Sequence, residues 1–461
     1  MRQEGIQKRV MQPKKRILSI AGSDPGGGAG IQQDIKVFTA LGVYGSAVIT
    51  ALTVQNTLGV QGVLPVDADF VARQAAAVIE DIRPHGIKAG MLANSSIIEA
   101  VFNAVSSSVN DAILVVDPVM IAKGGAPLLE KDAVRALKAR LLPIADVITP
   151  NIPEAEALLD RRIPDAGAMP KAALDLLRLV KKGGAVVLKG GHLEGGMMLD
   201  VVATQNGLTE LPHDRIRTMH THGTGCTFSS ALAVFLAGGC NATEAAGKAK
   251  AFVTTAIRGA FKVGRGIGPA NPIAPLENSL ERFDVIRRLE EAAGRLSSMP
   301  CRALAPEVQI NIGYSLPWPD SIMDVAAFPG RIIGLKDGVK AVSCPEFGAS
   351  SHVARIILTA MGSDPAFRSA MNIRFDESYI ERAAGLGLTV QEFSRDEEPE
   401  DVRAREGSTL SWGVRTAIER AGRVPDLIFD RGAAGKEPMI RLLGKEPVGV
   451  VEMALKIASI I

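Results

Sequence analysis

The stretch ILSIAGSDPGGGAGIQQDIKVFTAL, residues 17–41, decides the fold class of the chain. Its apolar start, Ile17–Ala21, predicts a buried strand, and Gly26–Gly30 predicts a glycine-rich turn. Ile31–Leu41 has apolar residues at helical spacing. In such a unit, backbone N–H groups and a helix N-terminus can face a small polar ligand. A tight turn that needs several glycines explains the segment equally well, and Asp24 can be an N-cap instead of a ligand contact.

The alternation of strand and helix continues along the chain. Further buried strands are expected at Ala47–Thr53, Gly86–Ala89, Ala112–Val116, Val147–Thr149 and Ala185–Leu188. Mostly helix-length segments separate these strands. Repeated units of this kind imply an α/β domain, in which helices cover both faces of a parallel sheet. Such a sheet binds ligands at the carboxyl ends of its strands.

The composition excludes several classes of partner. The 461 residues include 52 basic and 50 acidic side chains and only 4% aromatic residues, which disfavours polyanions and the stacking of nucleic-acid bases. The four cysteines form no C-x-x-C pair, so neither a zinc cage nor a disulfide framework is expected. No window suits a secretory signal or a transmembrane helix. We expect a cytoplasmic protein with no nucleic-acid or membrane partner.

Glycine and proline are densest in GRGIGPANPIAP, residues 264–275, where neither helix nor strand can run far. This segment predicts the domain boundary. We expect a flexible extension at residues 1–15, one domain at 16–275 and a second, smaller α/β domain at 280–461.

The second domain begins with an amphipathic pattern. Its apolar members are Leu280, Phe283, Ile286, Leu289 and Leu296, which predict a helix. Strands are expected at Val308–Ile312, Ile332–Leu335, Leu388–Glu392 and Leu427–Phe429. The charged segment 394–408 is typical of an exposed loop or the start of a helix.

A second glycine-containing loop, HGTGC at residues 222–226, precedes a helix of small residues. Gly223, Thr224 and Gly225 expose amides that can form an anion hole. Cys226 lies in the first helical turn, where we expect the helix dipole to lower the pKa of its thiol and make it a proton acceptor. Packing of a small apolar side chain under a turn is the alternative. No G-x-x-x-x-G-K-[ST] pattern occurs, which excludes a Walker-type nucleotide site.

Four more polar residues follow predicted strands. Asn151 and Glu154, three positions apart in TPNIPEAEALL, can hold the water shell of Mg²⁺ near phosphates, or can simply cap a helix. Asp117 in DPVM and Lys189 in LKGGH are placed where ligands bind at the edge of a sheet, although each can be a solvated charge. Their joint occurrence favours a phosphate site.

The order AGSDPGGGAG, ITALTVQNT, GML, DPVM, TPNIPEA, LKGGH and HGTGCT resembles the hydroxymethylpyrimidine/phosphomethylpyrimidine kinases of thiamine biosynthesis, in the ribokinase-like superfamily. The resemblance covers residues 16–269. It implies two successive phosphoryl transfers from ATP with Mg²⁺, first to the hydroxymethyl group of the pyrimidine and then to the monophosphate. G-T-G-C is characteristic of this subgroup and of some pyridoxal kinases, so pyridoxal remains an alternative substrate.

The resemblance also implies roles for individual residues. Gly22, Asp24, Gln55, Met91 and Val119 would line the pyrimidine pocket, and Gln55 can hydrogen-bond the ring and its amine. Cys226 would be the base beside the anion hole. Asn151 and Glu154 would organise Mg²⁺, with Asp117 and Lys189 near the phosphates. Phosphoryl transfer depends mainly on positioning and charge neutralisation, which these residue types supply.

The second domain has its own candidate site. Gly348, Ser350 and Ser351 in GASSH precede an apolar helix and resemble a phosphate cradle, with His352 in the first turn. A capping or half-buried histidine is the alternative. Arg331 in AAFPGRIIGL can equally be a surface charge. Asp430 and Lys436 lie in a loop, DRGAAGKEP, that can be an exposed turn; Lys436 suits a phosphate.

These segments resemble the ThiN type of thiamine-phosphate synthase, over about residues 280–461. The resemblance implies that pyrimidine diphosphate and thiazole phosphate are joined to thiamine phosphate with release of pyrophosphate, and that Arg331 and His352 are required. Two alternatives remain, because ThiN-like domains also act as thiamine-phosphate sensors, and the domain can be a silent docking or oligomerisation module. We expect small-molecule substrates and a homo-oligomer.

Overall fold

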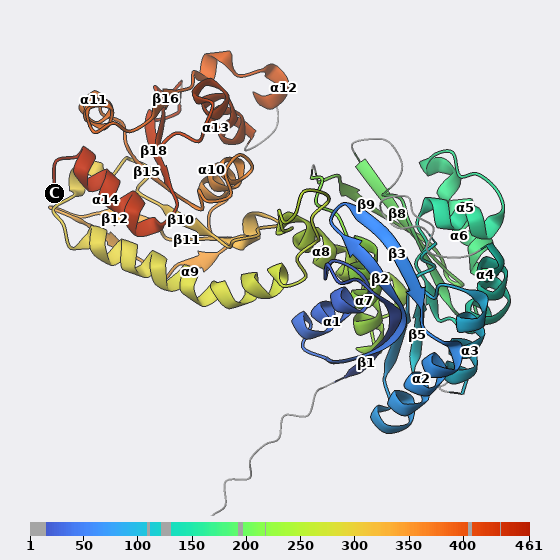
Figure 1. Cartoon of the computed structure of the whole chain (residues 1–461). Coiled ribbons are helices and arrows are strands. Elements are labelled where there is room, and N and C mark those ends of the chain that lie inside the picture. The colour runs from blue at the N-terminus through green and yellow to red at the C-terminus, as the bar shows by residue number, and fades with distance from the viewer. Residues whose placement is uncertain are drawn as a thin grey trace, which may run out of the picture. The chain divides into compact units, whose positions relative to one another are not determined.

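The computed structural model describes residues 15–107, 111–120, 131–191, 197–216, 218–403, 408–433 and 435–461 (Figure 1). The chain divides into two compact units, Met1–Leu276 and Glu277–Ile461, each with its own apolar cores. The division falls just after the segment rich in glycine and proline. The expected flexible extension lies outside the described residues apart from Lys15.

A largely parallel sheet forms the centre of the first unit. In the described residues its strand order is β3-β2-β1-β4-β5-β6-β7-β8-β9. The strands are β1 (Arg16–Ser23), β2 (Tyr44–Asn56), β3 (Gly59–Pro65), β4 (Gly86–Ala89), β5 (Ile113–Val116), β6 (Val147–Ile148), β7 (Ala185–Lys189), β8 (Met197–Thr204) and β9 (Gly207–Asp214). Strands β2, β1, β4, β5, β6 and β7 run parallel, which confirms the predicted sheet, and β3, β8 and β9 are antiparallel additions.

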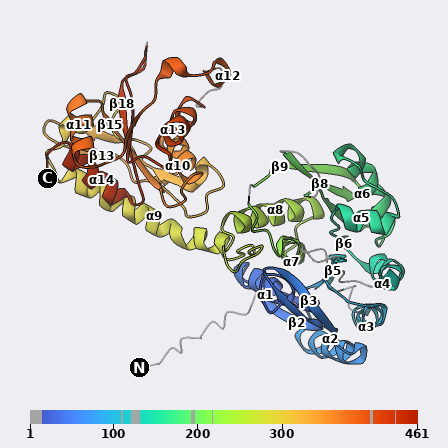
Figure 2. The ribbon, with the colours of Figure 1, turned by 45° about the horizontal axis from the view of Figure 1, so that its top comes forward.

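Helices cover both faces of this sheet (Figure 2). On one face lie α2 (Ala68–Ile82), α3 (Ser95–Val105), α4 (Lys131–Ala136), the short η1 (Leu137–Leu141) and η2 (Leu142–Ile144), α5 (Ile152–Leu159), η3 (Ala166–Ala168) and α6 (Met169–Leu177). On the other lie α1 (Gly30–Ala40), α7 (Thr224–Ala237) and α8 (Ala242–Arg258). Because side chains alternate along a strand, Leu18 and Ile20 pack in the first layer and Ile17 in the second. The loops after the parallel strands gather at one edge.

The second unit has a mixed, mainly antiparallel sheet. Its order in the described residues is β14-β11-β10-β15-β18-β17-β16, and only β16 and β17 pair in parallel. The strands are β10 (Ile312–Ser315), β11 (Val325–Ala327), β14 (Glu346–Phe347), β15 (Ser369–Arg374), β16 (Val390–Glu392), β17 (Leu427–Asp430) and β18 (Met439–Gly444); β12 (Ile332–Gly334) and β13 (Val339–Ala341) form a separate hairpin.

Helices cover both faces of the second sheet as well. On one face lie α9 (Ala274–Ser297), α11 (Glu377–Gly385) and α14 (Pro447–Ile457), and on the other α10 (Ser351–Met361) and α13 (Ser408–Ala421). The shorter elements are η4 (Arg302–Leu304), η5 (Ile322–Asp324), η6 (Arg395–Glu397) and α12 (Glu400–Arg403). No helix in the described part of the chain is both long and apolar enough to span a membrane.

The structure corrects one expectation for the second domain and refines two others. The strand expected at Val308–Ile312 begins only at Ile312, because Gln309 has a φ of +66°, which interrupts an extended run. The expected amphipathic helix is confirmed as α9, but Leu280 and Phe283 are 70% and 76% exposed, since the contact of α9 with the apolar core begins at Val285. The helix alternative for the segment 394–408 is confirmed by η6 and α12, although Glu398 between them is buried, and residues 404–407 lie outside the described residues.

Candidate active site

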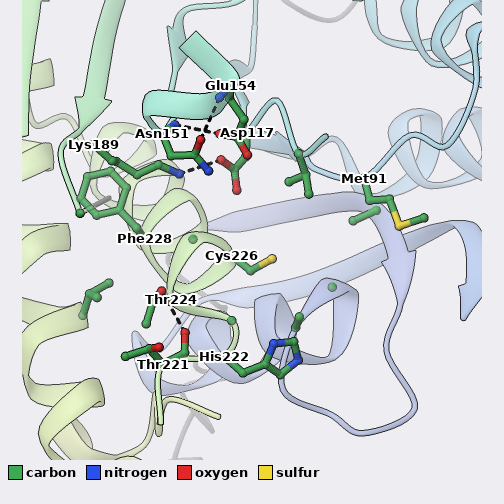
Figure 3. A pocket seen from close by; sticks show the side chains of 18 of the residues that line it. Met91, Asp117, Asn151, Glu154, Lys189, Thr221, His222, Thr224, Cys226 and Phe228 are labelled. Atoms are coloured by element: carbon green, nitrogen blue, oxygen red, sulfur yellow. Dashed lines mark hydrogen bonds and ion pairs between the residues drawn. The ribbon is translucent and has the colours of Figure 1, made fainter. Parts of the chain in front are cut away.

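A cavity of about 620 Å³ lies at the carboxyl ends of the parallel strands in the first unit (Figure 3). The residues that line it lie in or just after the strands β1, β2, β4, β5, β6, β7 and β8, or belong to α1, α5, α7, α8 and the loop before α7. Every residue that the sequence assigned to the first site is among them: Gly22, Asp24, Gln55, Met91, Asp117, Val119, Asn151, Glu154, Lys189, Gly223, Thr224, Gly225 and Cys226. The fold therefore gathers into one space residues that the sequence scatters over two hundred positions.

Asp24 organises the glycine-rich loop after β1. Its carboxylate accepts hydrogen bonds from the amides of Gly26, Gly28 and Ala29 at 2.8–3.1 Å. Nε2 of His222 lies 2.9 Å from the same carboxylate. Burial opposes the charge of Asp24, but the hydrogen bond with His222 and those from the amides lower its pKa below the usual value. Asp24 is therefore ionised and holds the loop through its amides. It is not the N-cap of α1, which is Ala29.

The HGTGC loop meets the glycine-rich loop through its backbone. Gly223 has a φ of +74°, and a Cβ at this position would lie 1.7 Å from the carbonyl oxygen of Gly28, so only glycine fits. Gly223 is the N-cap of α7, which begins at Thr224. The first turn of α7 lines the cavity and offers its unpaired amides there. This is the arrangement of an anion hole at a helix N-terminus.

The thiol of Cys226 lies in this first turn, and burial raises its pKa to about 11. The positive charge of Lys88 lowers the pKa, the negative charges of Asp34 and Asp117 raise it, and a hydrogen bond from the amide of Gly30 lowers it. The expectation that the helix dipole depresses the pKa is therefore wrong, because the penalty for burying a thiolate is larger than the effect of the helix end.

Asp117 and Lys189 form an ion pair inside the cavity, with Nζ 3.0 Å from Oδ1 (Figure 3). Asp117 also accepts hydrogen bonds from the hydroxyl groups of Thr149 and Ser229. Burial opposes the charge of Asp117, but Lys189 and Lys88 lower its pKa, so the carboxylate is ionised. It in turn raises the pKa of Lys189 despite burial. A fixed ammonium thus stands at the end of β7, where a phosphate group can reach it.

Asn151 and Glu154 begin α5 with a capping box. The side chain of Asn151 accepts from the amide of Glu154 at 2.9 Å, and Oε2 of Glu154 accepts from the amide of Asn151 at 2.8 Å. The capping alternative is therefore realised. Burial raises the pKa of Glu154 to about 7; Lys189 lowers it and the charge of Asp117 raises it. A nearby cation would stabilise the ionised form of this carboxyl group.

The second unit carries the other candidate residues around the start of α10. Ser350 is the N-cap, and its hydroxyl accepts from the amide of Val353. Gly348 has a φ of +77°, which suits glycine. His352 remains exposed in the first turn of α10, and partial burial of its ring together with nearby cations lowers its pKa. Its imidazole is therefore neutral near neutral pH.

The cations that act on His352 are Arg331, Arg355, Lys436 and Arg441. Arg441 is neutralised by Asp430, whereas Arg331, Arg355 and Lys436 have no ion-pair partner within the part of the chain that the structure describes. Arg331 also has a φ of +62°, a strained conformation for a non-glycine residue of the kind that collects at functional sites. Unneutralised cations around a helix N-terminus form a site for an anion with several charges.

A family model described as "Phosphomethylpyrimidine kinase" matches residues 24–271, which is more than half of the chain. The chain belongs to this family. A second model, described as "Thiamine-phosphate synthase ThiN", matches residues 288–456. The kinase family and the ThiN domain together make this chain an enzyme of thiamine biosynthesis with a ribokinase-like first unit.

Individual relatives agree with this kinase assignment. The hydroxymethylpyrimidine/phosphomethylpyrimidine kinase of Haemophilus influenzae is 47% identical over 57% of this chain and 97% of its own length. The thiamine biosynthesis bifunctional protein ThiED of Geobacter sulfurreducens is 47% identical over 60% of this chain, which spans only 56% of that relative. The pyridoxal kinase of Staphylococcus aureus, solved with pyridoxal, is 34% identical with a TM-score of 0.52, over 57% of this chain and 94% of the other.

Several cavity residues of the kinase unit were missed by the sequence analysis. Lys88 lies within the predicted strand Gly86–Ala89, where no motif marks it, and His222 opens the HGTGC loop, in which the sequence analysis gave roles only to the four residues that follow. One part of the cavity wall is apolar and includes Met198, Phe228, Val253 and Ile257. Val253 and Ile257 are four positions apart on α8, so helical spacing identifies a shared face, yet only the fold shows that this face borders the cavity.

Asp430 does not belong to the candidate phosphate site of the ThiN domain. Its carboxylate is completely buried and lies 2.7 Å from both Arg441 and Arg395. These two partners outweigh burial and lower the pKa of Asp430. The expected role of Asp430 in phosphate binding is corrected. Its negative charge is balanced by two arginines inside the unit and repels an anion.

Asp430→Ala is expected to lower the unfolding free energy of the second unit by about 3–5 kcal/mol, since it leaves the buried Arg441 guanidinium uncompensated. Trp318 and Trp412, the two tryptophans of the chain, both lie in this unit, so tryptophan fluorescence in urea follows its unfolding separately. Glu377→Ala removes an exposed partner of Arg431 and should change the value by less than about 1 kcal/mol. Equal effects of both substitutions would contradict this account.

Proposed function

We propose that the first unit phosphorylates hydroxymethylpyrimidine and then its monophosphate with ATP, and that the second unit joins the resulting diphosphate to thiazole phosphate. The observation that carries the proposal is the cavity itself, in which the Cys226 thiol, an anion hole and the Lys189 ammonium surround one space. Pyridoxal kinases similar to the first unit have been solved with ADP and with AMP-PCP, which supports the use of ATP.

The first transfer begins with deprotonation of the substrate hydroxyl. Its O–H bond breaks and the proton passes to the sulfur of Cys226 in its thiolate form. The oxygen then bonds to the γ-phosphorus of ATP, the bond to the bridging oxygen breaks, and ADP leaves. The amides at the start of α7 and the ammonium of Lys189 neutralise charge on the transferring group. In the second transfer the acceptor is a phosphate oxygen that is already ionised at neutral pH and needs no base.

The first site fits Mg²⁺ bound partly through the substrate. No cluster of three or more His, Cys, Asp or Glu side chains suited to a metal occurs among the described residues, so a closed protein cage is not present there. Glu154 offers Oε1, which lies outside the capping box, and its raised pKa reflects burial beside another carboxylate, a state that a divalent cation relieves. Mg²⁺ commonly takes one or two carboxylates and completes its shell with phosphates and water. When bound, it would neutralise phosphate charge.

Glu154→Gln should remove a pH dependence of Mg²⁺ activation. Because the pKa of Glu154 is about 7, the carboxyl is mostly protonated at pH 6 and mostly ionised at pH 8, and a proton competes with the metal. In the wild type, the apparent KM for Mg²⁺ should therefore rise on going from pH 8 to pH 6. This rise should be about tenfold larger than the rise in Glu154→Gln over the same pH range. Glu210→Gln, on the exposed β9, should behave as wild type. Parallel pH profiles of wild type and Glu154→Gln would refute metal binding by Glu154.

The second reaction requires neutralisation of a departing pyrophosphate. The bond between the pyrimidine methylene carbon and the pyrophosphate oxygen breaks, and the thiazole nitrogen bonds to that carbon. Arg331, Arg355 and Lys436 supply positive charge that no carboxylate in the described chain neutralises. Neutral His352 can donate an N–H to the anion. This grouping supports catalysis rather than a silent module.

The test is to incubate the whole chain with hydroxymethylpyrimidine, thiazole phosphate, ATP and Mg²⁺ and to identify the products by mass spectrometry. Thiamine phosphate is the expected product. Accumulation of the pyrimidine diphosphate alone would refute the synthase half and favour a sensor or docking module, and absence of ADP would refute the kinase half.

Pyridoxal is a second candidate acceptor for the first unit. The likeness to the Staphylococcus aureus pyridoxal kinase solved with pyridoxal favours it, at 34% identity and a TM-score of 0.52. Competition between pyridoxal and hydroxymethylpyrimidine in the same assay measures the preference as a ratio of kcat/KM values. A ratio that favours pyridoxal would overturn the assignment of the pyrimidine as the preferred substrate.

A further inference from the structure

A buried ion pair beside the cavity has no part in the reaction described above. Nζ of Lys88 lies 2.9 and 3.1 Å from the two carboxylate oxygens of Asp34, and both side chains are completely inaccessible to solvent. Lys88 belongs to β4 and Asp34 to α1. A buried pair carries a large desolvation penalty, and apolar side chains of similar size often stabilise a fold as well. Stability alone is therefore a weak reason for its position.

The hydrogen bonds of Asp34 tie together the two helices whose first turns line the cavity. Asp34 accepts from Ser19 Oγ of β1 and from Ser230 Oγ of α7, both at 2.6 Å. Ser230 follows Cys226 by four positions on α7, and Asp34 follows Gly30 by four positions on α1, so each lies one turn below a residue of the site. The network therefore connects α1 to α7 one turn below Gly30 and Cys226.

Lys88 also belongs to the wall of the cavity that Cys226 lines. Its side chain is among those that line the cavity, and a Cβ at Gly90 would lie 2.7 Å from its Nζ, so glycine leaves room for the ammonium. The charged groups that act on the thiol are Lys88 from β4, Asp34 from α1 and Asp117 after β5. Only Lys88 among these three favours a thiolate, and the amide of Gly30 adds a hydrogen bond. Asp34 raises the pKa of Lys88, despite burial, and so keeps it charged.

We propose that Lys88 is a positioning residue for Cys226: held by Asp34, its ammonium provides the positive charge that compensates the Cys226 thiolate. The inference rests on the proposed role of Cys226 as the base of the first transfer. In that step the proton moves from the substrate oxygen to sulfur, and Lys88 keeps its own proton throughout. One fixed charge, in place of water, thereby offsets part of the burial that disfavours the thiolate.

The test is the rate at which iodoacetamide alkylates Cys226 at pH 9, followed by peptide mass spectrometry. Only the thiolate reacts, so a rise of one unit in the pKa of the thiol slows alkylation tenfold. Lys88→Met should slow it at least tenfold. Cys344, an exposed thiol of the other unit, serves as the internal control and should react unchanged. Lys250→Met removes a lysine that also lines the cavity but pairs with Asp200, and should leave the Cys226 rate unchanged.

The sign of the effect separates charge from structural damage. A loosened site would expose the thiol and speed alkylation, whereas loss of the cation slows it. If Lys88→Met does not fold because Asp34 is left unpaired, the double variant Asp34→Asn/Lys88→Met, which replaces both charges, is tested instead. The alkylation rate of its Cys226 should fall below that of wild type. A rate equal to or above that of wild type in the folded variant overturns the inference.

Turnover distinguishes this inference from the proposed function. Lys88→Met should lower kcat for hydroxymethylpyrimidine in step with the alkylation rate. Slower alkylation with unchanged turnover would refute Cys226 as the base, and the inference would fall with it. Lower turnover with unchanged alkylation would overturn the inference and leave the role of Cys226 standing.

Discussion

Cys226→Ala is expected to lower kcat for the phosphorylation of hydroxymethylpyrimidine by about 10²–10⁴-fold, the range for removal of a general base. The thiol lies in the first turn of α7, where the amides would stabilise the transferring phosphoryl group in the proposed reaction. The substitution removes the proton acceptor and keeps those amides. KM for ATP should therefore change little, and the loss should appear in kcat.

The second phosphoryl transfer should be affected less than the first by Cys226→Ala. Its acceptor, the monophosphate, is already an anion at neutral pH, so no proton has to be removed before attack. We expect the ratio of the two kcat values to shift toward the second transfer by at least tenfold. The two acceptors are assayed separately, with ADP release as the common readout.

Cys344→Ala is the matched control for this prediction, because Cys344 is an exposed thiol in the second unit. Its kinase rates should equal those of wild type. Equal losses of both transfers in Cys226→Ala would argue for a role of Cys226 in shaping the anion hole instead of in proton transfer. Wild-type rates for the first transfer would remove Cys226 as the base altogether.

The parallel sheet and the membership of the first cavity could be predicted from the sequence, because strand ends in such a sheet share one edge. Motifs that follow strands, such as those of Asp117, Asn151 and Lys189, therefore meet whatever the lengths of the helices between them. The glycines of the two loops also predict the cavity, because the positive φ of Gly223 and its close approach to Gly28 leave no room for a side chain.

The electrostatics of the site could not be predicted from motifs, because they depend on burial and on residues without a motif. Cys226 was expected to have a lowered pKa from its place in α7, yet its burial raises the pKa, and Lys88 and Asp34 act on it from other elements. Asp430 illustrates the same limit in the second unit. A loop aspartate followed by glycine has the pattern of a ligand site, but only the fold shows that two arginines enclose it.

Arg331→Ala and His352→Ala are each expected to lower thiamine phosphate formation by at least 10²-fold while the kinase rates stay within twofold of wild type. In the proposed reaction each side chain would offer a charged or N–H donor to the departing pyrophosphate, and a hydrogen bond to a charged group is worth about 1.5–3 kcal/mol, more where charge develops in the transition state. Thiamine phosphate and ADP are measured in the same reaction.

Arg331→Gly sharpens this prediction, because Arg331 has a φ of +62° and glycine adopts that conformation without strain. It removes the guanidinium and relaxes the backbone, so a loss of coupling with unchanged or higher stability, followed by fluorescence of Trp318 and Trp412, is a loss of charge and not of fold. Arg431→Ala is the control, since its charge is balanced by Glu377 and Glu392. Unchanged thiamine phosphate formation in Arg331→Gly would refute the cation site. An equal loss in Arg431→Ala would show that the effect comes from positive charge in general and not from the position of Arg331.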